Sequence, residues 1–454
     1  MSERPSLAVD EDELALLTDL YQLTMTQAYW KEAMDGVATF SLFFRRLPPE
    51  RRFMLACGQQ HAAERLSRLR FGGTALSRLA DTGLFEAGFL DWLANWRFEG
   101  DIWTLSEGTP VFANEPLMEV EAPIAQAQLL ESLAMNLVQL ETVLASKAVR
   151  IVMAARGRPV VDFGMRRMHG IDAAVRGVRA YRTAGLAGTS NVLGGLRHHL
   201  ALNGTMAHSY VLAHDSERAA FRAFARHYPG TTLLVDTHDT LEGVQKVIEL
   251  MREEPELAVK AIRLDSGDLG ELARGSRRLL DDAGHDEIRI VASSGLDERQ
   301  IEALLEAGTP IDAFGVGTQM GVSADAPVID LSYKLVTYAD EPRVKHSPGK
   351  VNLPCPKQVY RRRDEQGHYL GDMIALRDEP VAAGEPVAAG EPLLRPLVKT
   401  GRLVEAEMAR ADEARERVAD ALPRFPASVR RLEAGESDYP VMLSPGLERL
   451  QSRS

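Results

Sequence analysis

The sequence has few cysteines and no long apolar run. Its 454 residues include two cysteines, Cys57 and Cys355, too few for a disulfide framework or a cysteine-rich zinc motif, so we expect a reducing compartment. No uncharged apolar run approaches the ~18 residues of a membrane span, and the acidic first residues lack the blocks of a signal peptide. The net charge of −12 disfavours nucleic acid and anionic membranes as main partners. We therefore expect a cytoplasmic protein that acts on small molecules.

The spacing of the apolar residues changes twice along the chain. Residues 1–125 mix helical and strand-like patterns and predict an N-terminal α+β domain. In residues 126–335, short apolar runs alternate with helices, which predicts a parallel sheet and a closed or partial (β/α) barrel, since no GxGxxG opens the series. Residues 336–454 predict a small C-terminal module packed on the other two, in which the repeated EPVAAG forms two reverse turns. The fold class is therefore α/β.

Each predicted barrel strand ends in polar or glycine residues. The carboxyl ends of barrel strands meet at one edge, so these residues are expected to gather there. Glycine and serine N–H groups can cradle phosphate, arginines can fork onto anions, and aspartates can hold magnesium or sugar hydroxyls. Alternatively, the aspartates pair with neighbouring arginines or cap helices, as we predict for Asp268 and Asp297. The pattern predicts a sugar phosphate or nucleotide substrate without choosing the reaction. The residues are Asp162, Arg166, Arg167, Asp236, His238, Asp239, Arg263, Asp265, Ser266, Asp268, Ser293, Ser294, Gly295, Gly315, Gly317 and Thr318.

The segment GTMAHSY places His208 in a setting that fits neither an ordinary core strand nor an ordinary helix. His208 and His214 are six residues apart, which is too far for the i, i+4 pair of a helical zinc site. Packing, proton transfer and metal binding all remain open for His208 on spacing alone.

Several of these strings together resemble the nicotinate phosphoribosyltransferase family. The resemblance is carried in order by LLTDLYQLTM, FFRRLPPERRFMLACG, EGTPVFANEPLMEVE, VVDFGMRRMHG, AGTSNV, GTMAHSY, VDTHD, IRLDSGDL, FGVGTQM and YKLVTY, and it covers roughly residues 14–360. It implies a type II phosphoribosyltransferase fold with a partial barrel and a homodimer with the active site at the interface. It also implies the first step of NAD salvage: nicotinate displaces pyrophosphate from 5-phosphoribosyl 1-pyrophosphate to give nicotinate mononucleotide, with magnesium and ATP hydrolysis.

The resemblance assigns roles to residues of the matching strings. His208 corresponds to the histidine that ATP phosphorylates, and Asp236 and Asp265 suit catalysis at the ribose and the binding of magnesium. Because the pyridine nitrogen is already nucleophilic, a strong base is not needed, and phosphate acceptance is the better use of His208. The nicotinate contacts are expected at Tyr21, Arg166, Ser190, Thr205 and Arg263, and the phosphoribosyl and phosphate contacts at Ser293, Ser294, Gly295, Gly315, Gly317 and Thr318.

Three positions speak to specificity or depart from the family pattern. Ser190 stands where the related nicotinamide enzyme typically has aspartate, whose charge would repel nicotinate, so the acid is the expected substrate. Met168 replaces a usual alanine. Cys355 replaces a usual glycine and would strain its turn if that turn needs a positive φ.

The alternatives are a nicotinamide or quinolinate phosphoribosyltransferase, a metal-dependent barrel hydrolase using His208, His214 and His238, and a non-catalytic nucleotide sensor. Comparing the turnover of nicotinate, nicotinamide and quinolinate distinguishes the phosphoribosyltransferases from one another. Tightly bound, stoichiometric zinc would favour the hydrolase. The intact set of Tyr21, Arg166, His208 and Arg263 disfavours a sensor.

Overall fold

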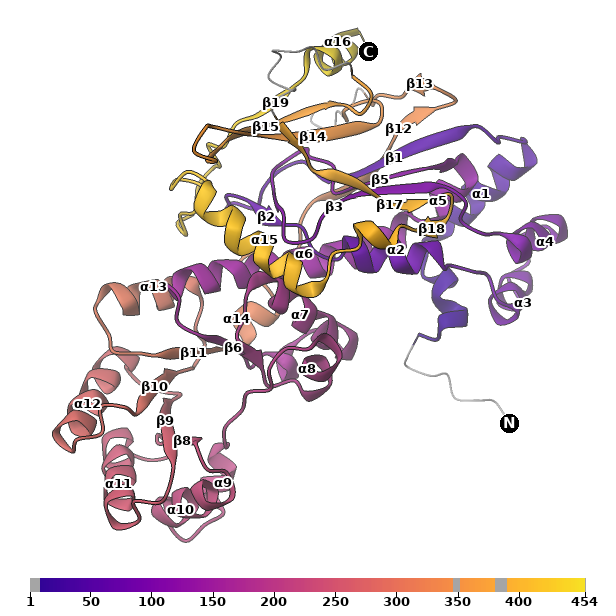
Figure 1. Ribbon diagram of the computed structural model, residues 1–454. Coiled ribbons are helices and arrows are strands. Elements are labelled where there is room, and N and C mark those ends of the chain that lie inside the picture. Colours follow the sequence, from indigo (N-terminus) through magenta and orange to yellow (C-terminus); the bar gives the residue numbers. More distant parts are fainter. Residues whose placement is uncertain (1–8, 346–351, 380–389, 454) are drawn as a thin grey trace. The chain divides into compact units, whose positions relative to one another are not determined.

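The chain divides into two compact units in the computed structural model, which describes residues 9–345, 352–379 and 390–453 (Figure 1). The barrel unit comprises residues 143–327, and the sheet unit combines residues 1–142 with 328–454. Most of the EPVAAG duplication lies outside the described residues. No helix among the described residues is long and apolar enough to cross a membrane.

The barrel unit is built from six parallel strands in the order β7-β6-β11-β10-β9-β8. Helices α11, α12 and α13 flank these strands (Figure 1). Asp239, Asp268 and Asp297 begin these three helices as side-chain N-caps, a contribution of about 1 kcal/mol each. The capping predicted for Asp268 and Asp297 is therefore confirmed. The strands are β6 Val160–Asp162, β7 Gly188–Thr189, β8 Thr231–Leu234, β9 Val259–Leu264, β10 Arg289–Ala292 and β11 Ala313–Val316, and the helices are η2 Met165–Arg167, α7 Ile171–Ala184, α8 Val192–His198, α9 His208–Leu212, α10 Glu217–His227, α11 Thr240–Glu253, α12 Leu269–Asp282, α13 Glu298–Glu306 and α14 Thr318–Gly321.

The strand order makes this sheet a partial barrel, as predicted. The first strand, β6, pairs with the last, β11, as in a closed barrel, but β7 and β8 are the two edges of the sheet. The chain that leaves β7 forms an isolated bridge between Leu202 and Thr189. It then contacts Arg263 of β9 through Thr205, and Thr237, which follows β8, through His208. The GTMAHSY segment thus runs from one side of the barrel opening to the other.

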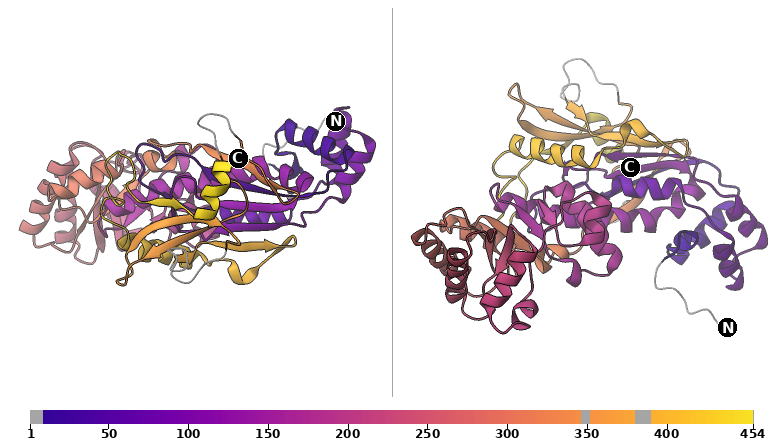
Figure 2. Two further views of the ribbon diagram at one scale, coloured as in Figure 1. Left: turned by 90° about the horizontal axis from the view of Figure 1, so that it is seen from above. Right: turned by 60° about the horizontal axis from the view of Figure 1, so that its bottom comes forward.

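The sheet unit is built around a seven-stranded antiparallel sheet of order β13-β12-β1-β5-β3-β17-β18. A four-stranded sheet, β16-β14-β15-β19, lies beside helix α15 (Figures 1 and 2). The strands of the sheet unit are β1 Val37–Phe44, β2 Met54–Leu55, β3 Asp101–Leu105, β4 Pro110–Val111, β5 Met118–Pro123, β12 Leu331–Tyr338, β13 Glu341–Pro342, β14 Lys357–Arg363, β15 Tyr369–Leu376, β16 Gly390–Pro392, β17 Leu394–Lys399, β18 Arg402–Leu403 and β19 Val441–Leu443. Its helices are η1 Glu11–Leu16, α1 Leu20–Lys31, α2 Gln59–Ser67, α3 Gly73–Asp81, α4 Ala87–Asn95, α5 Ile124–Leu129, η4 Glu405–Glu407, α15 Ala411–Arg424 and α16 Pro445–Arg453; α6 Glu131–Ala154 runs through the boundary between the units.

The first and last parts of the sequence share this unit because their strands pair. Strand β12 pairs with β1 and strand β17 with β3. The buried carboxylate of Glu119 also holds Lys357 and Arg377, at 2.9 and 2.6 Å. The division of the chain into three segments stays a prediction. In the structure, strands of the first and third segments pair with each other, and both segments belong to one unit.

A buried polar cluster lies in the core of the sheet unit. Arg361 binds Asp372 through two nitrogens, with Nε–Oδ1 at 3.0 Å and Nη2–Oδ2 at 2.6 Å, and Tyr439 donates its hydroxyl to Asp372 Oδ1 at 2.9 Å. Glu115 accepts the backbone N–H of Phe112. Burial, together with the negative charge of Asp372, raises the pKa of Glu115 well above its usual range. Both effects favour the protonated, neutral form of Glu115 beside the Asp372 carboxylate.

This protonation makes the stability of the fold depend on pH in a defined direction. The stability that Glu115 contributes is fully present below its ordinary pKa of 4.5 and is lost as pH rises toward the raised folded pKa, by up to about 1.4 kcal/mol per pH unit in that window. Gln in place of Glu115 keeps a donor toward Asp372 without titrating. We expect the Glu115→Gln variant to gain urea stability relative to the parent as the pH rises above 4.5. Parallel stability curves for the two proteins would refute the neutral acid.

The two departures from the family pattern have clear structural settings. Cys355 adopts φ of +62°, the left-handed region that costs a side-chain-bearing residue about 1–2 kcal/mol, so the strain expected of a residue in place of glycine is present. Met168 packs against α7, where its sulfur lies 3.7 Å from the Tyr181 hydroxyl.

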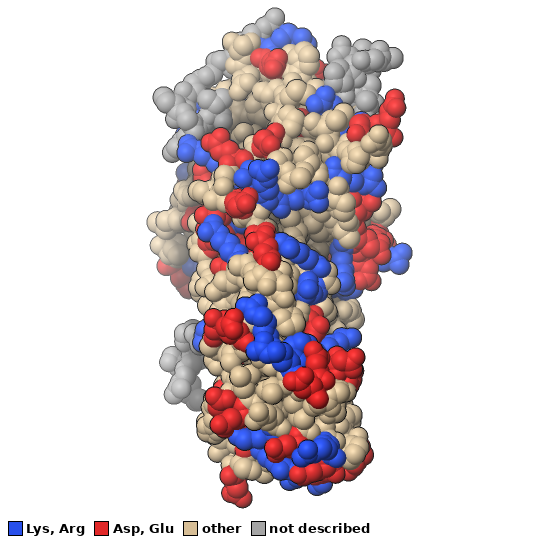
Figure 3. All heavy atoms as spheres, turned by 90° about the vertical axis from the view of Figure 1, so that its left-hand side faces the viewer, with Lys and Arg blue, Asp and Glu red and all other residues tan. Residues whose placement is uncertain are grey.

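The surface shown in Figure 3 carries both charge signs closely interspersed. Many of the exposed charges pair within or between helices, such as Arg218 and Arg222 with Glu253. This face therefore presents no broad basic area of the kind that binds nucleic acid.

Candidate active site

Arg263, the fifth residue of β9, is the hub of the barrel edge. Its three guanidinium nitrogens donate to three different residues: Nε to Ser293 Oγ at 2.8 Å, Nη1 to Thr205 Oγ1 at 3.0 Å and Nη2 to Asp265 Oδ1 at 2.7 Å. The guanidinium also lies over the ring of Phe163, 5.0 Å from its centroid. The group is thus held in one orientation from four sides, as recognition of a planar anion requires.

Asp265 connects this hub to His208. Burial raises the pKa of Asp265, but the Ser293 hydrogen bond and the Arg263 charge outweigh burial and hold the pKa below its usual value. Asp265 Oδ2 lies 3.8 Å from His208 Nε2, while His208 Nδ1 lies 3.2 Å from Thr237 Oγ1. The His208 side chain is 42% exposed. An imidazole with both nitrogens near polar partners, yet open to solvent, is accessible to a second substrate.

Asp236 offers the better of the two predicted magnesium ligands. Its Oδ2 accepts the Asp265 N–H at 2.8 Å and the Ser266 hydroxyl at 2.6 Å. Its Oδ1 is buried and has no hydrogen-bond partner among the described residues, so one carboxylate oxygen remains for a cation. Asp265 is less available because Arg263 and Ser293 already share its Oδ1. These donors fit magnesium, which prefers carboxylate oxygens and retains waters.

The turns after β10 and β11 carry the features of an anion cradle. Ser294 adopts φ of +102° and Gly295 φ of +63°, and a side-chain-bearing residue in the former conformation stores strain of about 1–3 kcal/mol, which is found mainly at functional sites. Thr318 begins α14 immediately after Gly317 and accepts a hydrogen bond from Arg167 Nη1 at 3.0 Å. The predicted phosphate residues of both turns therefore stand at the carboxyl ends of adjacent strands.

The structure also shows which residues the sequence reasoning missed. Phe163 lies beneath Arg263, and a Cβ on Gly315 would come within 2.4 Å of its ring, so Gly315 leaves room for Phe163. Arg167 contacts Thr318, whereas Arg166, the predicted anion ligand, is exposed and forms no hydrogen bond or ion pair with another described residue. An aromatic residue directly after a strand end was the available signal for Phe163.

The remaining predicted residues fall at two places. Ser190 follows β7 at the same sheet edge and donates its N–H to the Asp162 carbonyl at 2.8 Å. Tyr21 is half-exposed on α1 and belongs to the sheet unit. The barrel unit thus brings together Ser190, Thr205, His208, Asp236, Arg263, Asp265 and the turns at 293–295 and 315–318.

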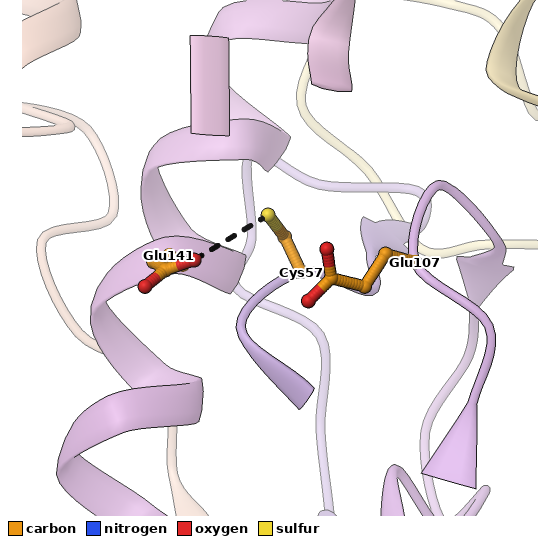
Figure 4. A group of neighbouring side chains, drawn as sticks. All are labelled: Cys57, Glu107 and Glu141. Atoms are coloured by element: carbon orange, nitrogen blue, oxygen red, sulfur yellow. Dashed lines mark hydrogen bonds between the residues drawn. The ribbon is translucent and has the colours of Figure 1, made fainter. Parts of the chain in front are cut away.

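A group of side chains with the spacing of metal ligands lies in the sheet unit, not at the barrel edge. Cys57, Glu107 and Glu141 of the sheet unit place ligand atoms within 4.8 Å of one another (Figure 4). Each has a local partner: Glu107 accepts the N–H groups of Gly58 and Gln60, and Glu141 lies 2.8 Å from His61 Nδ1. The trio His208, His214 and His238 forms no such group among the described residues, and His214 contacts the Tyr210 carbonyl, which disfavours the hydrolase.

Comparison with known proteins identifies the family of the chain. The model of the nicotinate phosphoribosyltransferase (NAPRTase) N-terminal domain matches residues 16–139, that of the NAPRTase family residues 159–338, and that of the C-terminal domain residues 356–451. Nicotinate phosphoribosyltransferase pncB2 of Mycobacterium tuberculosis is 48% identical over 439 residues, 96% of this chain and 93% of the relative. The Bacillus subtilis nicotinate phosphoribosyltransferase is 39% identical over 381 residues, 82% of this chain and 78% of the relative.

Solved structures match over nearly the whole chain. Human nicotinic acid phosphoribosyltransferase superposes with a TM-score of 0.84 at 27% identity, covering 96% of this chain and 99% of that one. The nicotinate-nucleotide pyrophosphorylase of Pyrococcus furiosus superposes with a TM-score of 0.75 at 25% identity, covering 93% and 98%. Together with these matches, the partial parallel barrel defines a type II phosphoribosyltransferase fold. Within that class, the chain belongs to the nicotinate phosphoribosyltransferase family.

Proposed function

We propose that the chain is an ATP-coupled nicotinate phosphoribosyltransferase of NAD salvage. It converts nicotinate and 5-phosphoribosyl 1-pyrophosphate to nicotinate mononucleotide and pyrophosphate. The observation that carries the proposal is the Arg263 hub, a fixed guanidinium at the barrel edge between Thr205, Ser293 and Asp265. Membership of the family supplies the reaction, and the hub supplies a binding partner for the nicotinate carboxylate.

In the proposed reaction, the pyridine nitrogen attacks the anomeric carbon of the ribose while the bond to pyrophosphate breaks. Arg263 and Thr205 orient the nicotinate, with the Phe163 ring beside the guanidinium. The low pKa of Asp265 keeps this carboxylate ionised near neutral pH, so it can stabilise the positive charge that develops on the ribose. The N–H groups of residues 293–295 and 317–318, which follow β10 and β11, hold the phosphate of the phosphoribosyl group.

Asp236, with Asp265 as a second carboxylate, would hold magnesium, because its buried Oδ1 is available. Bound magnesium supplies positive charge that stabilises the departing pyrophosphate.

His208 is the proposed acceptor of the ATP γ-phosphoryl group. A ring nitrogen attacks the γ-phosphorus, a P–N bond forms as the bond to ADP breaks, and the ring loses its proton. Contacts on both ring nitrogens and the open side of the ring support this role. Hydrolysis of the phosphohistidine then releases phosphate and drives the transfer.

A labelling experiment tests the proposed role of His208. Incubation with γ-labelled ATP should give acid-labile, alkali-stable label on the protein. His208→Ala should abolish the label and retain a slow, ATP-independent transfer. Label that persists in this variant would contradict the assignment of His208 as the phosphate acceptor. Loss of phosphoribosyl transfer together with the label would leave the proposed ATP coupling unsupported. His214→Ala is the matched control, since His214 contacts only local groups among the described residues, and it should keep the label.

Ser190 should set the preference for the acid over the amide. A carboxylate at this position would repel the nicotinate carboxylate and could accept from an amide N–H. We expect Ser190→Asp to lower kcat/KM for nicotinate by about tenfold or more and to raise the nicotinamide-to-nicotinate ratio. Competition assays with nicotinate, nicotinamide and quinolinate measure this, with Ser190→Asn as the uncharged control. A parent enzyme that prefers nicotinamide would defeat the Ser190 argument.

We also propose a homodimer with the active site at its interface. Apolar side chains are exposed on α7 and α8 of the barrel unit, including Ile171 and Leu196, and near α1 of the sheet unit, including Leu17 and Leu20. Exposed apolar groups of this kind typically mark interfaces. Light scattering on the protein as it elutes from a size-exclusion column should give twice the chain mass of 50.0 kDa, and a monomer mass would contradict the proposal.

A further inference from the structure

The sheet unit contains a polar cavity that no step of the proposed reaction uses. Its volume is about 520 Å³, within the usual range for small-molecule sites. It lies between strands β14 and β17, helix α15 and the turn before β4. Four arginines line it, Arg361, Arg363, Arg395 and Arg417, together with the hydroxyl residues Ser106 and Thr109.

Most charges in the cavity wall are already neutralised. Arg361 is paired with Asp372 and Arg363 with Glu391. Two acidic lining residues are paired with arginines that do not line the cavity: Glu413 with Arg410, and Asp420 with Arg424. Over the part of the chain that the structure describes, the lining charges without an ion pair are Arg395, Arg417 and Glu407. The unpaired balance is therefore positive.

Arg417 carries the stronger part of this argument. Its side chain is half-buried, and one nitrogen, Nη1, donates to the backbone carbonyl of Glu107. Burial lowers the pKa of Arg417, and the negative charges of Glu413, Glu107 and Glu391 only partly oppose this effect. The guanidinium is thus partly withdrawn from water, and no carboxylate of the described residues forms an ion pair with it, although Glu413, Glu107 and Glu391 lie near enough to act on it electrostatically. Such an arrangement is costly unless an anion completes it.

We propose that this cavity binds a small phosphate-bearing sugar metabolite, with its phosphate between Arg395 and Arg417. Guanidinium forks match phosphate geometry, and the Ser106 and Thr109 hydroxyls suit sugar hydroxyls. Every lining residue belongs to the sheet unit, whereas the residues of the transfer site described above belong to the barrel unit, apart from Tyr21. The site is therefore additional to the phosphoribosyl site and independent of the proposed reaction.

Calorimetric titration of the full-length protein with ribose 5-phosphate tests the proposal, with ribose as the phosphate-free control. Arg395→Gln and Arg417→Gln should each weaken one component of the isotherm by about tenfold or more, because a charged hydrogen bond is lost. Arg415→Gln is the matched control: Arg415 is exposed on the same helix and does not line the cavity. It should leave the isotherm unchanged. Arg395 is exposed, and its side chain forms no hydrogen bond or ion pair with another described residue, so its variant keeps the test valid even if Arg417→Gln unfolds.

Three results would overturn the proposal. The first is isotherms of Arg395→Gln and Arg417→Gln that superimpose on the parent. The second is an Arg415→Gln variant that loses the same component, since general charge would then explain the binding. The third is ribose binding as tightly as ribose 5-phosphate.

Discussion

Replacing Arg263 by alanine should lower kcat/KM for nicotinate by about 10³-fold. The guanidinium is the fixed cation of the barrel edge, and its removal also leaves Asp265, Ser293 and Thr205 without their shared donor. A site built to hydrogen-bond a substrate group rejects a substrate that lacks this group by about 10⁴-fold, and we expect the loss of Arg263 to come within about tenfold of this factor. Steady-state kinetics with saturating phosphoribosyl pyrophosphate measures the effect.

Arg263→Lys separates charge from geometry. Lysine keeps the positive charge but cannot reach three acceptors in fixed directions, and we expect a loss of about 10²-fold. Arg278→Ala, an exposed residue on α12, is the matched control and should stay within about twofold of the parent. Retention of more than a tenth of the parent activity by Arg263→Ala would remove Arg263 from the substrate contacts, provided that both proteins unfold at the same urea concentration.

Replacing Arg361 by methionine should cost about 3–5 kcal/mol of unfolding free energy. The side chain is buried, holds Asp372 through two nitrogens and donates to the Pro110 carbonyl at 2.8 Å. Rings of Phe112, Tyr369 and Phe425 surround its guanidinium at 5.1–6.0 Å. Without Arg361, the Asp372 charge stays buried with no cation beside it, and an unpaired buried charge strongly destabilises the folded state. Urea unfolding measures the change.

Two further variants define the cause of that loss. The double variant Arg361→Met with Asp372→Asn removes both charges and should recover part of the stability lost by Arg361→Met alone. Arg363 lies two residues after Arg361 on β14 and forms an exposed ion pair with Glu391. Arg363→Gln breaks this pair and should cost at most about 1 kcal/mol of unfolding free energy. Equal losses in Arg361→Met and Arg363→Gln would show that burial of the charge is not what matters.

The sequence predicts the barrel well because its strands are short, local and punctuated. Five of the six strands, β6 and β8 to β11, coincide with the apolar runs, and the aspartate caps follow from position alone. Strand β7, two residues long, gave no periodic signal. The apolar sequence between β5 and β6 forms two helices, α5 and α6, which are separated at Leu130. Local propensity does not specify this break, because tertiary packing decides it.

The merged sheet unit was not predictable for a different reason. Pairing of β17 with β3 joins residues nearly 300 positions apart, and no local pattern encodes a partner at that distance. The site shows the same contrast. Strand-end logic located Asp236, Arg263 and Asp265, and the family resemblance gave His208 a role. Neither revealed that Arg263 joins Thr205, Ser293 and Asp265 at one point, nor that Phe163 lies against it.

The division of one sheet between the two ends of the sequence has a consequence during synthesis. The barrel unit is continuous in sequence and can fold as soon as residues 143–327 have left the ribosome. Strands β1 and β3 must instead wait for β12 and β17, with their hydrogen-bonding edges open. At about 5–20 residues per second, the roughly 250 residues between the first segment and β17 take on the order of 10–50 s to emerge. During that interval the nascent sheet exposes aggregation-prone edges, so its yield in cells should depend on chaperones that shield them.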